Sequence, residues 1–427
     1  MEMNSTKMKV SRTSFWFQAA FEWLVAILIQ NTFLAELTKE LGFSDAQIGV
    51  IGSITSLGCL FQLVSMFFRR GSYKVYSMVV SVINQVLFML LYVIPSTPID
   101  ASVKRIVFIV FITLAYAGLY IGNPKISVWR YSLVEPNKRG RYNAVMQMIS
   151  LLMGSVFAFA MGAIVDKFKA EGDLYGAFTV CAITIFVLMV IHSLTIILVV
   201  DKKMEADGEE KKENVFKSII GVASNKKVLL LSGLFVIYNA ANCAAVPFYS
   251  TFMIGELQMD QVEAQIINAV IASGIQFAIA LPLGMIADKY SFPKMLMLCL
   301  ISMTLRTLFI VFANPENGFW CFVLFRLFDA AVQVGAPGAM INMVINEVPE
   351  NRSADALAFC QSVGGITGFG CTLLMSSLVN KIQQDGNMFF GMNVYAQQVV
   401  SVIASLITVV ACVYLWLGFF ERKKKNV

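Results

Sequence analysis

The chain has 427 residues, of which 58% are hydrophobic and only 14% are charged, and its formal net charge is +6. Soluble globular domains contain about 25% charged residues, so this composition excludes an ordinary soluble protein and indicates a protein that lies in a membrane. The length accommodates about twelve bilayer spans of about 20 residues each, with short connections between them.

Apolar runs bounded by charged residues, Pro or Gly predict the membrane-spanning segments, which fall into two sets of six. The first set covers residues 14–37, 45–68, 75–95, 104–128, 143–165 and 175–200. The second set covers residues 228–254, 262–287, 294–313, 318–346, 357–380 and 391–419. The runs lack strand-like alternation, and a segment in lipid must satisfy its own backbone hydrogen bonds, so we expect helices. Pro124 and Pro337 interrupt the fourth and tenth runs.

The distribution of Lys and Arg predicts the orientation of the chain. An even number of spans places both termini on one side, and the loops on that side hold most of the basic residues, including seven lysines between 202 and 227. By the positive-inside rule both termini are cytoplasmic, and the net charge reflects this bias rather than affinity for nucleic acid. The basic start resembles a signal peptide, but Glu22 lies inside the first apolar run, so we expect a retained helix. We expect a bacterial inner-membrane protein.

Cysteine and motif content narrows the function classes. All eight cysteines fall within predicted spans, and His192 is the single histidine, so the sequence predicts no metal site and no cofactor. No phosphate-binding loop and no nucleophile motif lies outside the spans, which argues against a soluble enzyme or an ATP-driven pump.

Three sequence blocks recur in the same order at an offset of about half the chain. "SDAQIGVIGS" from Ser44 shares Ala-Gln-Ile with "VEAQIINAVIAS", and "NTFLAEL" from Asn31 resembles "STFMIGEL" from Ser250. "VEPNKRGRYNAVMQ" from Val134 aligns with "VPENRSADALAFCQ" from Val348. The sequence therefore predicts a parallel duplication: a six-helix bundle in residues 1–200, a cytoplasmic linker in 201–227, and a second bundle in 228–427.

The loop "GMIADKYSFPKML" resembles the signature loop of the major facilitator superfamily at Gly284, Asp288 and Lys289. The equivalent first-half loop, "VSMFFRRGSYKVY", keeps Arg69 and Gly71 but has Phe68 where the acidic residue belongs. The resemblance implies an all-α membrane protein with twelve transmembrane helices, arranged as two six-helix bundles that rock around a central cavity. Asp288 and Lys289 are then candidates for a conformational latch, or else ordinary interfacial charges.

Four charged residues inside the predicted spans carry the functional hypothesis: Glu22, Arg306, Arg326 and Asp329. A charge at the bilayer centre costs about 2.5–3.5 kcal/mol, so it normally faces a cavity or a partner. Arg326, Asp329 and Gln333 share one helix face, and Arg306 lies almost level with Arg326. The two arginines would repel each other unless Asp329 or a substrate anion lay between them. A purely structural ion network is the alternative.

Glu22 and Asp329 are candidates for binding a coupling proton, because an apolar wall disfavours the charged form of a carboxyl group. Glu22 could instead be hydrated near the cytoplasmic surface. The resemblance also places the first, fourth, seventh and tenth helices around the cavity, so their polar residues become candidate ligands. These candidates are Tyr116, Tyr120, Asn123, Tyr238, Asn239 and Asn242. Some of these groups would serve helix packing instead.

The predicted function is secondary active transport by a monomer that takes up a small polar or anionic organic solute together with a proton. A drug/proton antiporter of the same superfamily is an alternative, although the fifth helix lacks the Gly-Pro pair that resembles the antiporter signature. A non-transporting membrane receptor is the alternative from another class, although it would be expected to carry an added signalling domain.

Overall fold

The computed structural model describes residues 5–43, 51, 58–68, 70–204, 215–259, 263–264 and 266–421. In this part of the chain, ten helical segments are long and apolar enough to cross a membrane. The chain is therefore an all-helical, multi-pass membrane protein. It folds as two compact units, with Met1–Glu135 and Val145–Val215 in unit 1 and Pro136–Ala144 and Phe216–Val427 in unit 2.

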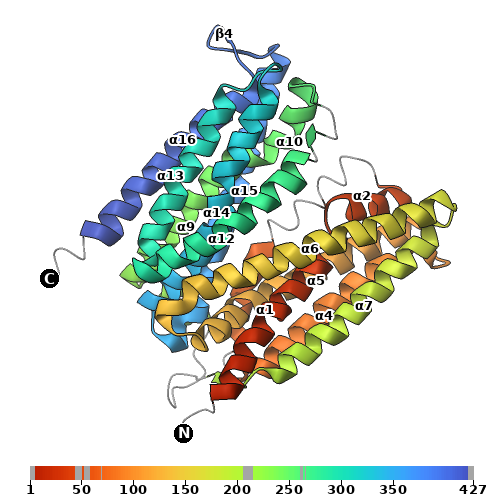
Figure 1. Ribbon diagram of the computed structural model, residues 1–427, viewed down its shortest axis with the longest axis vertical. Helices are drawn as coiled ribbons and strands as arrows, with labels where there is room; N and C mark the ends of the chain where they lie inside the picture. Colours follow the sequence, from red (N-terminus) through yellow and green to blue (C-terminus); the bar gives the residue numbers. More distant parts are fainter. Residues whose placement is uncertain are drawn as a thin grey trace. The chain divides into compact units, whose positions relative to one another are not determined.

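Unit 1 consists of long helices joined by short turns and one two-residue strand pair. Its elements are α1 (Ser5–Leu28), α2 (Asn31–Glu40), the 3-10 helix η1 (Cys59–Phe67), β1 (Gly71–Ser72), α4 (Tyr73–Val93), η2 (Ile94–Ser96), α5 (Ala101–Ser132), α6 (Arg139–Ala170), α7 (Leu174–Leu198) and β2 (Lys203–Met204) (Figure 1). The first turn of α6 and the preceding η3 (Pro136–Lys138) belong to unit 2. Helix α4 packs on α5 and α7, α1 packs on α7, and η1 packs on α5.

Unit 2 repeats this style of packing with a second set of long helices. Its elements are α8 (Val215–Ala223), α9 (Lys226–Ala245), η4 (Val246–Phe248), α10 (Tyr249–Thr251), the π-helices η5 (Phe252–Glu256) and η6 (Ile266–Ile271), α12 (Ala272–Lys289), α13 (Phe292–Val311), α14 (Gly318–Glu347), α15 (Glu350–Gln384), β3 (Met388–Phe389), β4 (Met392–Asn393), α16 (Ala396–Leu415) and η7 (Trp416–Glu421). Helix α13 packs on α14 and α16, α9 packs on α16 and α15, and α12 packs on α14.

Polar side chains fix the starts of several helices. The Asp173 carboxylate accepts a hydrogen bond from the Gly176 N–H at 2.8 Å at the start of α7. At the start of α9, the Asn225 amide oxygen accepts one from the Lys227 N–H at 2.9 Å. The first N–H groups of a helix have no partner within the helix, so these side chains replace water at the helix ends.

The first predicted span, 14–37, is not one continuous helix, because α1 ends at Leu28 and α2 begins at Asn31. Gln30 between them has an extended backbone, with φ −133° and ψ 168°. The break exposes carbonyl groups that α1 no longer pairs, and tyrosines from other helices satisfy them. The Tyr92 hydroxyl donates to the Leu28 carbonyl, and the Tyr116 hydroxyl donates to the Ile29 carbonyl at 3.5 Å.

Other predicted spans differ from the structure in smaller ways. Helices α5 and α14 run straight through Pro124 and Pro337, so neither proline ends its helix. The last helix begins at Ala396 rather than near residue 391, because a short hairpin of β3 and β4 occupies residues 388–393. Half of the second predicted span, 45–68, lies outside the described residues, and so does the whole Ala46-Gln47-Ile48 block.

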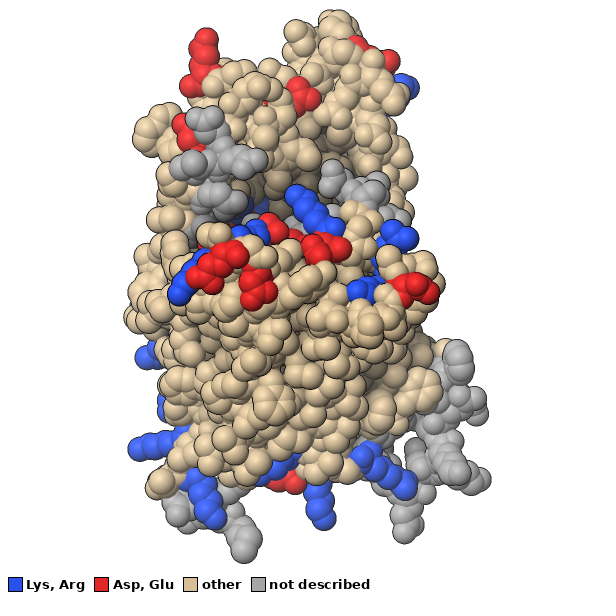
Figure 2. Space-filling view, turned by 90° about the vertical axis from the view of Figure 1, so that its right-hand side faces the viewer, with Lys and Arg blue, Asp and Glu red and all other residues tan. Residues whose placement is uncertain are grey.

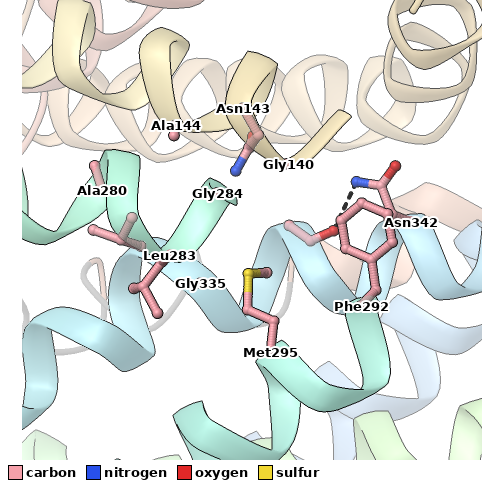
Figure 3. A pocket seen from close by; sticks show the side chains of 12 residues that line it. Gly140, Asn143, Ala144, Ala280, Leu283, Gly284, Phe292, Met295, Gly335 and Asn342 are labelled. Atoms are coloured by element: carbon pink, nitrogen blue, oxygen red, sulfur yellow. Dashed lines mark hydrogen bonds between the residues drawn. The ribbon is translucent and has the colours of Figure 1, made fainter. Parts of the chain in front are cut away.

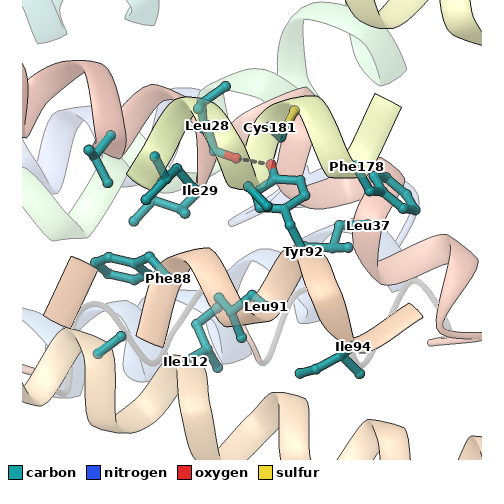
Figure 4. Packing of buried hydrophobic residues seen from close by; sticks show 14 of the residues in the cluster. Leu28, Ile29, Leu37, Phe88, Leu91, Tyr92, Ile94, Ile112, Phe178 and Cys181 are labelled. Carbon is teal, nitrogen blue, oxygen red and sulfur yellow. Dashed lines mark hydrogen bonds between the residues drawn. The ribbon is translucent and has the colours of Figure 1, made fainter. Parts of the chain in front are cut away.

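Each unit has its own apolar core. In unit 1 the core includes Leu28, Phe88, Leu91, Ile112 and Phe178, contributed by α1, α4, α5 and α7 (Figure 4). In unit 2 it includes the aromatic rings of Tyr249, Phe252, Phe322 and Phe325. Lipid tails are as apolar as these side chains, so close van der Waals packing rather than exclusion of water holds such helices together.

The outer surface is apolar over wide areas. Phe159 of α6 is 75% exposed and Leu374 of α15 is 69% exposed, and many other large apolar side chains resemble them. In Figure 2 the Lys, Arg, Asp and Glu side chains gather in bands that leave broad areas of uncharged surface between them. A soluble protein rarely exposes such patches, whereas lipid contact accounts for them.

A short strap, residues 199–204, follows α7 and ties together the ends of four helices of unit 1. The Val200 N–H donates to Ser11 Oγ of α1 at 2.9 Å, and Trp129 Nε1 of α5 donates to the Val200 carbonyl at 3.2 Å. The Asp201 carboxylate accepts hydrogen bonds from Ser72 Oγ at 2.7 Å and from the Lys74 N–H at 3.2 Å, at the start of α4. Strand β2 of the strap pairs with β1 in an antiparallel register.

Candidate functional site

A buried network of charged groups lies in unit 2, where α13 packs against α14. Arg306 of α13 is fully buried, and Asp329 of α14 is only 1% exposed. Arg306 Nη1 donates to Asp329 Oδ1, and Arg326 Nη1 donates to Asp329 Oδ2 at 2.9 Å. The carboxylate of Asp329 therefore lies between the two guanidinium groups. This arrangement removes the repulsion that two arginines at one depth would otherwise produce.

Amide side chains from neighbouring elements complete this network, which we call the Arg-Asp-Arg cluster. Arg306 Nη2 donates to Asn242 Oδ1 of α9 at 2.6 Å, and Arg326 Nη2 donates to Asn268 Oδ1 of η6. Gln333 Nε2, one turn beyond Asp329 on α14, makes a long contact of 3.4 Å with Asp329 Oδ1. The cluster thus joins α9, η6, α13 and α14.

The local helix geometry explains why these residues meet. Arg326 and Asp329 are three residues apart on α14, and Gln333 is four further on, so all three lie on one face of the helix. Phe325 precedes Arg326, and its ring lies below both guanidinium groups, 5.6 Å from Arg306 and 5.1 Å from Arg326 between the guanidinium carbon and the ring centroid. An aromatic face attracts cations, so the ring supports both arginines.

The three candidates on α9 have different hydrogen-bond partners and surroundings. Asn242 is bound to the Arg-Asp-Arg cluster, whereas the Asn239 amide donates at 2.8 Å to the Phe235 carbonyl of its own helix. Tyr238 is 8% exposed and close enough to Arg306 to interact with it electrostatically. Among these three candidates, Asn242 is therefore the one that is hydrogen-bonded directly to a charged group.

Glu22 lies half-buried on α1 of unit 1 and has a different environment. The Arg130 guanidinium of α5 acts on it electrostatically, but no ion pair joins the two within the described residues. One turn earlier on α1, Gln18 is 1% exposed, and its Oε1 has no hydrogen-bond partner in this part of the chain. Glu22 is thus a carboxylate near a cation but not directly bonded to it.

The three candidates on α5 lie in unit 1 and serve partly as packing. Tyr116 is 3% exposed, and its ring meets Phe88 edge-on with centroids 5.3 Å apart. Tyr120 is half-buried, and its ring lies directly against Gly58. Asn123 is also half-buried, one residue before Pro124. The two tyrosines therefore contribute to helix packing.

Asp288 of the signature loop lies against the start of α6. Its carboxylate accepts hydrogen bonds from the Gly140 N–H at 2.7 Å and the Arg141 N–H at 3.0 Å, and Arg141 Nε lies 3.1 Å from the same group. The Asp288 side chain is 2% exposed, whereas that of Arg141 is 59% exposed. A carboxylate at the N-terminus of a helix satisfies free N–H groups and complements the helix dipole.

Small residues let α6 and α12 approach closely enough for this contact. A Cβ atom added at Gly284 would lie 2.8 Å from the Ala144 Cβ, and one added at Gly140 would lie 2.7 Å from the Ala287 Cβ. A small, mainly apolar pocket opens beside this crossing (Figure 3). The Asn143 amide points into it from α6, while Leu283 and Met295 line it from α12 and α13. Glycine here is required for close helix packing.

Lys289 and Gly71, two further loop candidates, have surroundings of their own. The Lys289 ammonium lies 5.3 Å from the ring centroid of Tyr290 and is exposed. Gly71 has a φ of +117°, which favours glycine, and it pairs with Met204 in the strap of unit 1. Arg69 lies outside the described residues. In the first-half loop, where Phe68 replaces the acidic residue, the nearby carboxylate comes from Asp201.

Several polar residues of the interior lie outside the set predicted from the sequence. Asn268 sits in a run whose composition predicts an uninterrupted apolar helix, and Phe325 offers no signal beyond its position before Arg326. Lys125 is 4% exposed within α5, with its ammonium 6.0 Å from the Tyr76 ring centroid. A lysine inside an apolar run is the signal that could have identified it.

The single histidine, His192 of α7, pairs with an amide of α4: its Nδ1 lies 3.0 Å from Gln85 Nε2.

This chemistry can bind a charged solute or transfer a proton. In the described part of the chain, no group of three His, Cys, Asp or Glu side chains is arranged to hold a metal ion. The Arg-Asp-Arg cluster instead offers guanidinium and amide groups, which recognise carboxylates and hydroxyl groups.

A protein-family sequence model described as Major Facilitator Superfamily matches residues 15–253 and 230–427 of the chain. The crystal structure of the E. coli fucose:proton symporter FucP superposes with a TM-score of 0.68 at 13% identity, covering 97% of this chain and 98% of that chain. The proton:xylose symporter XylE superposes with a TM-score of 0.66 at 10% identity, covering 97% and 96%. A bacterial homologue of the iron transporter ferroportin gives 0.65 at 12% identity, covering 95% and 99%. At such identities these structures show a shared fold. No curated protein sequence matches the chain.

Proposed function

Because the chain belongs to the Major Facilitator Superfamily, we propose that it is a secondary active transporter that takes up a small polar or anionic organic solute together with a proton. It works by alternating access as a monomer in the bacterial inner membrane, with both termini cytoplasmic. FucP and XylE, which have the same fold, are described as proton symporters for sugars. That description supports coupling to protons, whereas the solute must be inferred from the residues of this chain.

The observation that carries the proposal is the Arg-Asp-Arg cluster. Charges inside a membrane cost about 2.5–3.5 kcal/mol each on insertion scales, so they are retained where they have a function or a partner. A structural ion pair would need one arginine for Asp329, but this cluster holds two, and the side chain of Arg326 is 24% exposed. The excess cation favours a binding role for the cluster, with Asn242 and Gln333 as further ligands.

We assign the coupling proton to Glu22 in preference to Asp329. A proton on Asp329 would leave the two bound guanidinium groups without their counter-ion. Glu22 has no such bonded cation in the described residues, and it interacts with Arg130 only at longer range. It can therefore gain and lose a proton without breaking an ion pair.

The proposed architecture is two six-helix repeats, residues 1–200 and 228–427, with the linker 201–227 between them and twelve spans in all. The helix pairings of unit 1 recur in unit 2, which supports the repeat. We further propose that Asp288 is a latch, since its bonds to the start of α6 must break if that helix moves away from α12. Lys289, which lies against Tyr290, is then an ordinary interfacial charge.

Transport by the purified full-length chain in proteoliposomes tests the proposal. Radiolabelled sugars, organic acids, amino acids and nucleosides would be offered with and without an inward proton gradient. We expect one chemical class to accumulate only with the gradient and to lose accumulation when an uncoupler is added. The control is Arg105→Gln, which changes a half-buried arginine outside the Arg-Asp-Arg cluster, and it should transport normally.

Thermal unfolding of the same protein identifies the class independently, because a ligand that binds the folded state raises its melting temperature. Stabilisation by lipophilic cations alone, without proton-driven uptake of any polar solute, would contradict import and favour drug export.

A further inference from the structure

The Arg-Asp-Arg cluster carries one positive charge in excess. It holds the two guanidinium groups of Arg306 and Arg326 and the single carboxylate of Asp329. In the described part of the chain, no other acidic side chain forms an ion pair with either arginine. A buried charge without a counter-ion is strongly unfavourable in a low-dielectric interior, so this arrangement lacks one negative charge.

Each arginine also has an unused donor. Both Nη atoms of each guanidinium are bound, those of Arg306 to Asp329 and Asn242, and those of Arg326 to Asp329 and Asn268. The Nε atoms of Arg306 and Arg326 are buried and have no hydrogen-bond partner among the described residues. Buried donors are nearly always paired, so two unpaired Nε groups beside an excess charge point to an acceptor that arrives from outside.

Such an acceptor can reach the cluster from the side of Arg326. Its side chain is 24% exposed, whereas Arg306 is fully buried. The edge of a guanidinium formed by Nε and one Nη matches the two oxygens of a carboxylate, and the planar group is already held over the Phe325 ring. A neutral hydroxyl group can use the donors but does not balance the charge.

We propose that the Arg-Asp-Arg cluster binds the carboxylate of an organic monoanion, with Arg326 as its direct partner. This inference rests on the proposed transport function and narrows its solute from polar or anionic to carboxylate-bearing. A single negative charge neutralises the cluster, whereas a phosphate dianion would leave it with one negative charge in excess. The carboxylate takes the Arg326 edge and shares that guanidinium with Asp329.

Matched pairs of compounds test the proposal on the purified full-length chain. Each pair differs only in the acidic group: galacturonate with galactose, gluconate with glucitol, and lactate with 1,2-propanediol. Thermal unfolding is followed against concentration, with chloride as the control for ionic strength. We expect at least one carboxylate to raise the melting temperature while its neutral partner does not. Arg326→Gln should lose this stabilisation, Arg326→Lys should weaken it about tenfold or more because the fork is lost, and Arg105→Gln should keep it.

Asp329→Asn provides a test in the opposite direction. It raises the excess charge of the cluster from one to two and removes the carboxylate that competes for Arg326, so the anion should bind more tightly than to the parent. Asn268→Ala frees Arg326 Nη2 without changing charge and should keep the preference for the acid. These variants decide the question if Arg326→Gln does not fold. Weaker carboxylate binding by Asp329→Asn would overturn the proposal.

The outcomes separate this inference from the proposed function. If neutral compounds stabilise the protein as well as their acids, or if no carboxylate shifts the melting temperature, the carboxylate site is wrong. Proton-driven uptake of a neutral solute that survives in Arg326→Gln would also overturn it, while leaving the transporter proposal intact. If no solute of any class moves in proteoliposomes, the transport function itself fails.

Discussion

The two units share helix pairings but bury different polar chemistry. The pairing of α4 with α5 in unit 1 corresponds to that of α13 with α14 in unit 2. In unit 2 this interface holds the Arg-Asp-Arg cluster, whose charges are directly bonded. In unit 1, α4 carries Asn84 and Gln85, whose buried amide oxygens have no partner among the described residues.

The difference teaches that packing and polar chemistry are set by separate residues. Apolar side chains and small residues determine which helices meet, and these are similar in kind in both units. The few polar residues are then free to differ, so unit 2 has an ion network while unit 1 has Glu22 with Arg130 at longer range. We interpret unit 2 as the solute-binding half and unit 1 as the proton-binding half.

Arg306→Met should have the largest effect on stability, because it disrupts the ion network that distinguishes unit 2 from unit 1. The substitution leaves Asp329 with one arginine and removes the link from α13 to α9 through Asn242. Asp329 keeps Arg326 as its counter-ion, but two buried hydrogen bonds of a charged group are lost, each worth about 1.5–3 kcal/mol in the free energy of unfolding. Denaturant or thermal unfolding in detergent would measure it. The double variant Arg306→Met with Asp329→Leu should be less stable still, because it leaves Arg326 without its carboxylate, and equal stability of the single variant and the parent would contradict the network.

Asp288→Ala should have the next largest effect, because the Asp288 carboxylate caps the start of α6. Loss of such a cap costs about 1–2 kcal/mol, and the bonds to the Gly140 and Arg141 N–H groups disappear together. In unfolding measurements Asp288→Asn should lose less than Asp288→Ala, because the amide oxygen can still accept a hydrogen bond from the helix N–H groups. Lys289→Ala is the matched control in the same loop and should change stability little, since Lys289 is exposed and its ammonium lies beside the Tyr290 ring.

Asp201→Ala tests whether the strap does for unit 1 what Asp288 does for unit 2. Asp201 is exposed, so the cost should be smaller, about 0.5–1 kcal/mol. Hydrogen exchange is the sharper measurement, because the N–H of Lys74, which donates to Asp201, should exchange faster. If that exchange is unchanged, Asp201 does not stabilise its helix start in the way that Asp288 stabilises the start of α6.

Glu22→Gln should change stability least, within about 0.5 kcal/mol, because no bonded cation loses its partner. Its effect should lie in transport: accumulation against a gradient stops, while exchange of solute across the membrane continues. Asp329→Asn, in contrast, should lower both stability and transport. Unchanged uphill uptake in Glu22→Gln would remove Glu22 as the proton carrier and with it the proposed division of roles.

Much of the fold could be predicted from the sequence because apolar runs of about 20 residues have few alternatives in a bilayer. The break after Leu28 could not, since no Pro or Gly marks it. Its carbonyls are satisfied by Tyr92 and Tyr116, which come from helices far along the chain. A local sequence pattern does not indicate partners that lie so far along the chain.

The candidate site could be predicted in part for the same reason. The spacing of Arg326, Asp329 and Gln333 places them on one helix face. The repulsion between two level arginines predicts that Asp329 or a substrate anion lies between them, and in the structure Asp329 is bonded to both. Asn242 is a candidate ligand from the sequence, but its bond to Arg306, like that of Asn268 to Arg326, depends on which faces of α9 and η6 turn toward α13 and α14. Lys125 and Arg130 are visible as charges in or near an apolar run, but their positions alone do not show which groups they face.

The strap has a practical consequence for dividing the chain. Because residues 199–204 tie the ends of α1, α4, α5 and α7, a gene fragment that stops at the end of α7 would remove those ties. A fragment that continues through Met204 keeps them. Co-expression of two separate polypeptides, the first ending at Met204, should therefore yield more folded first half than a split at Leu198.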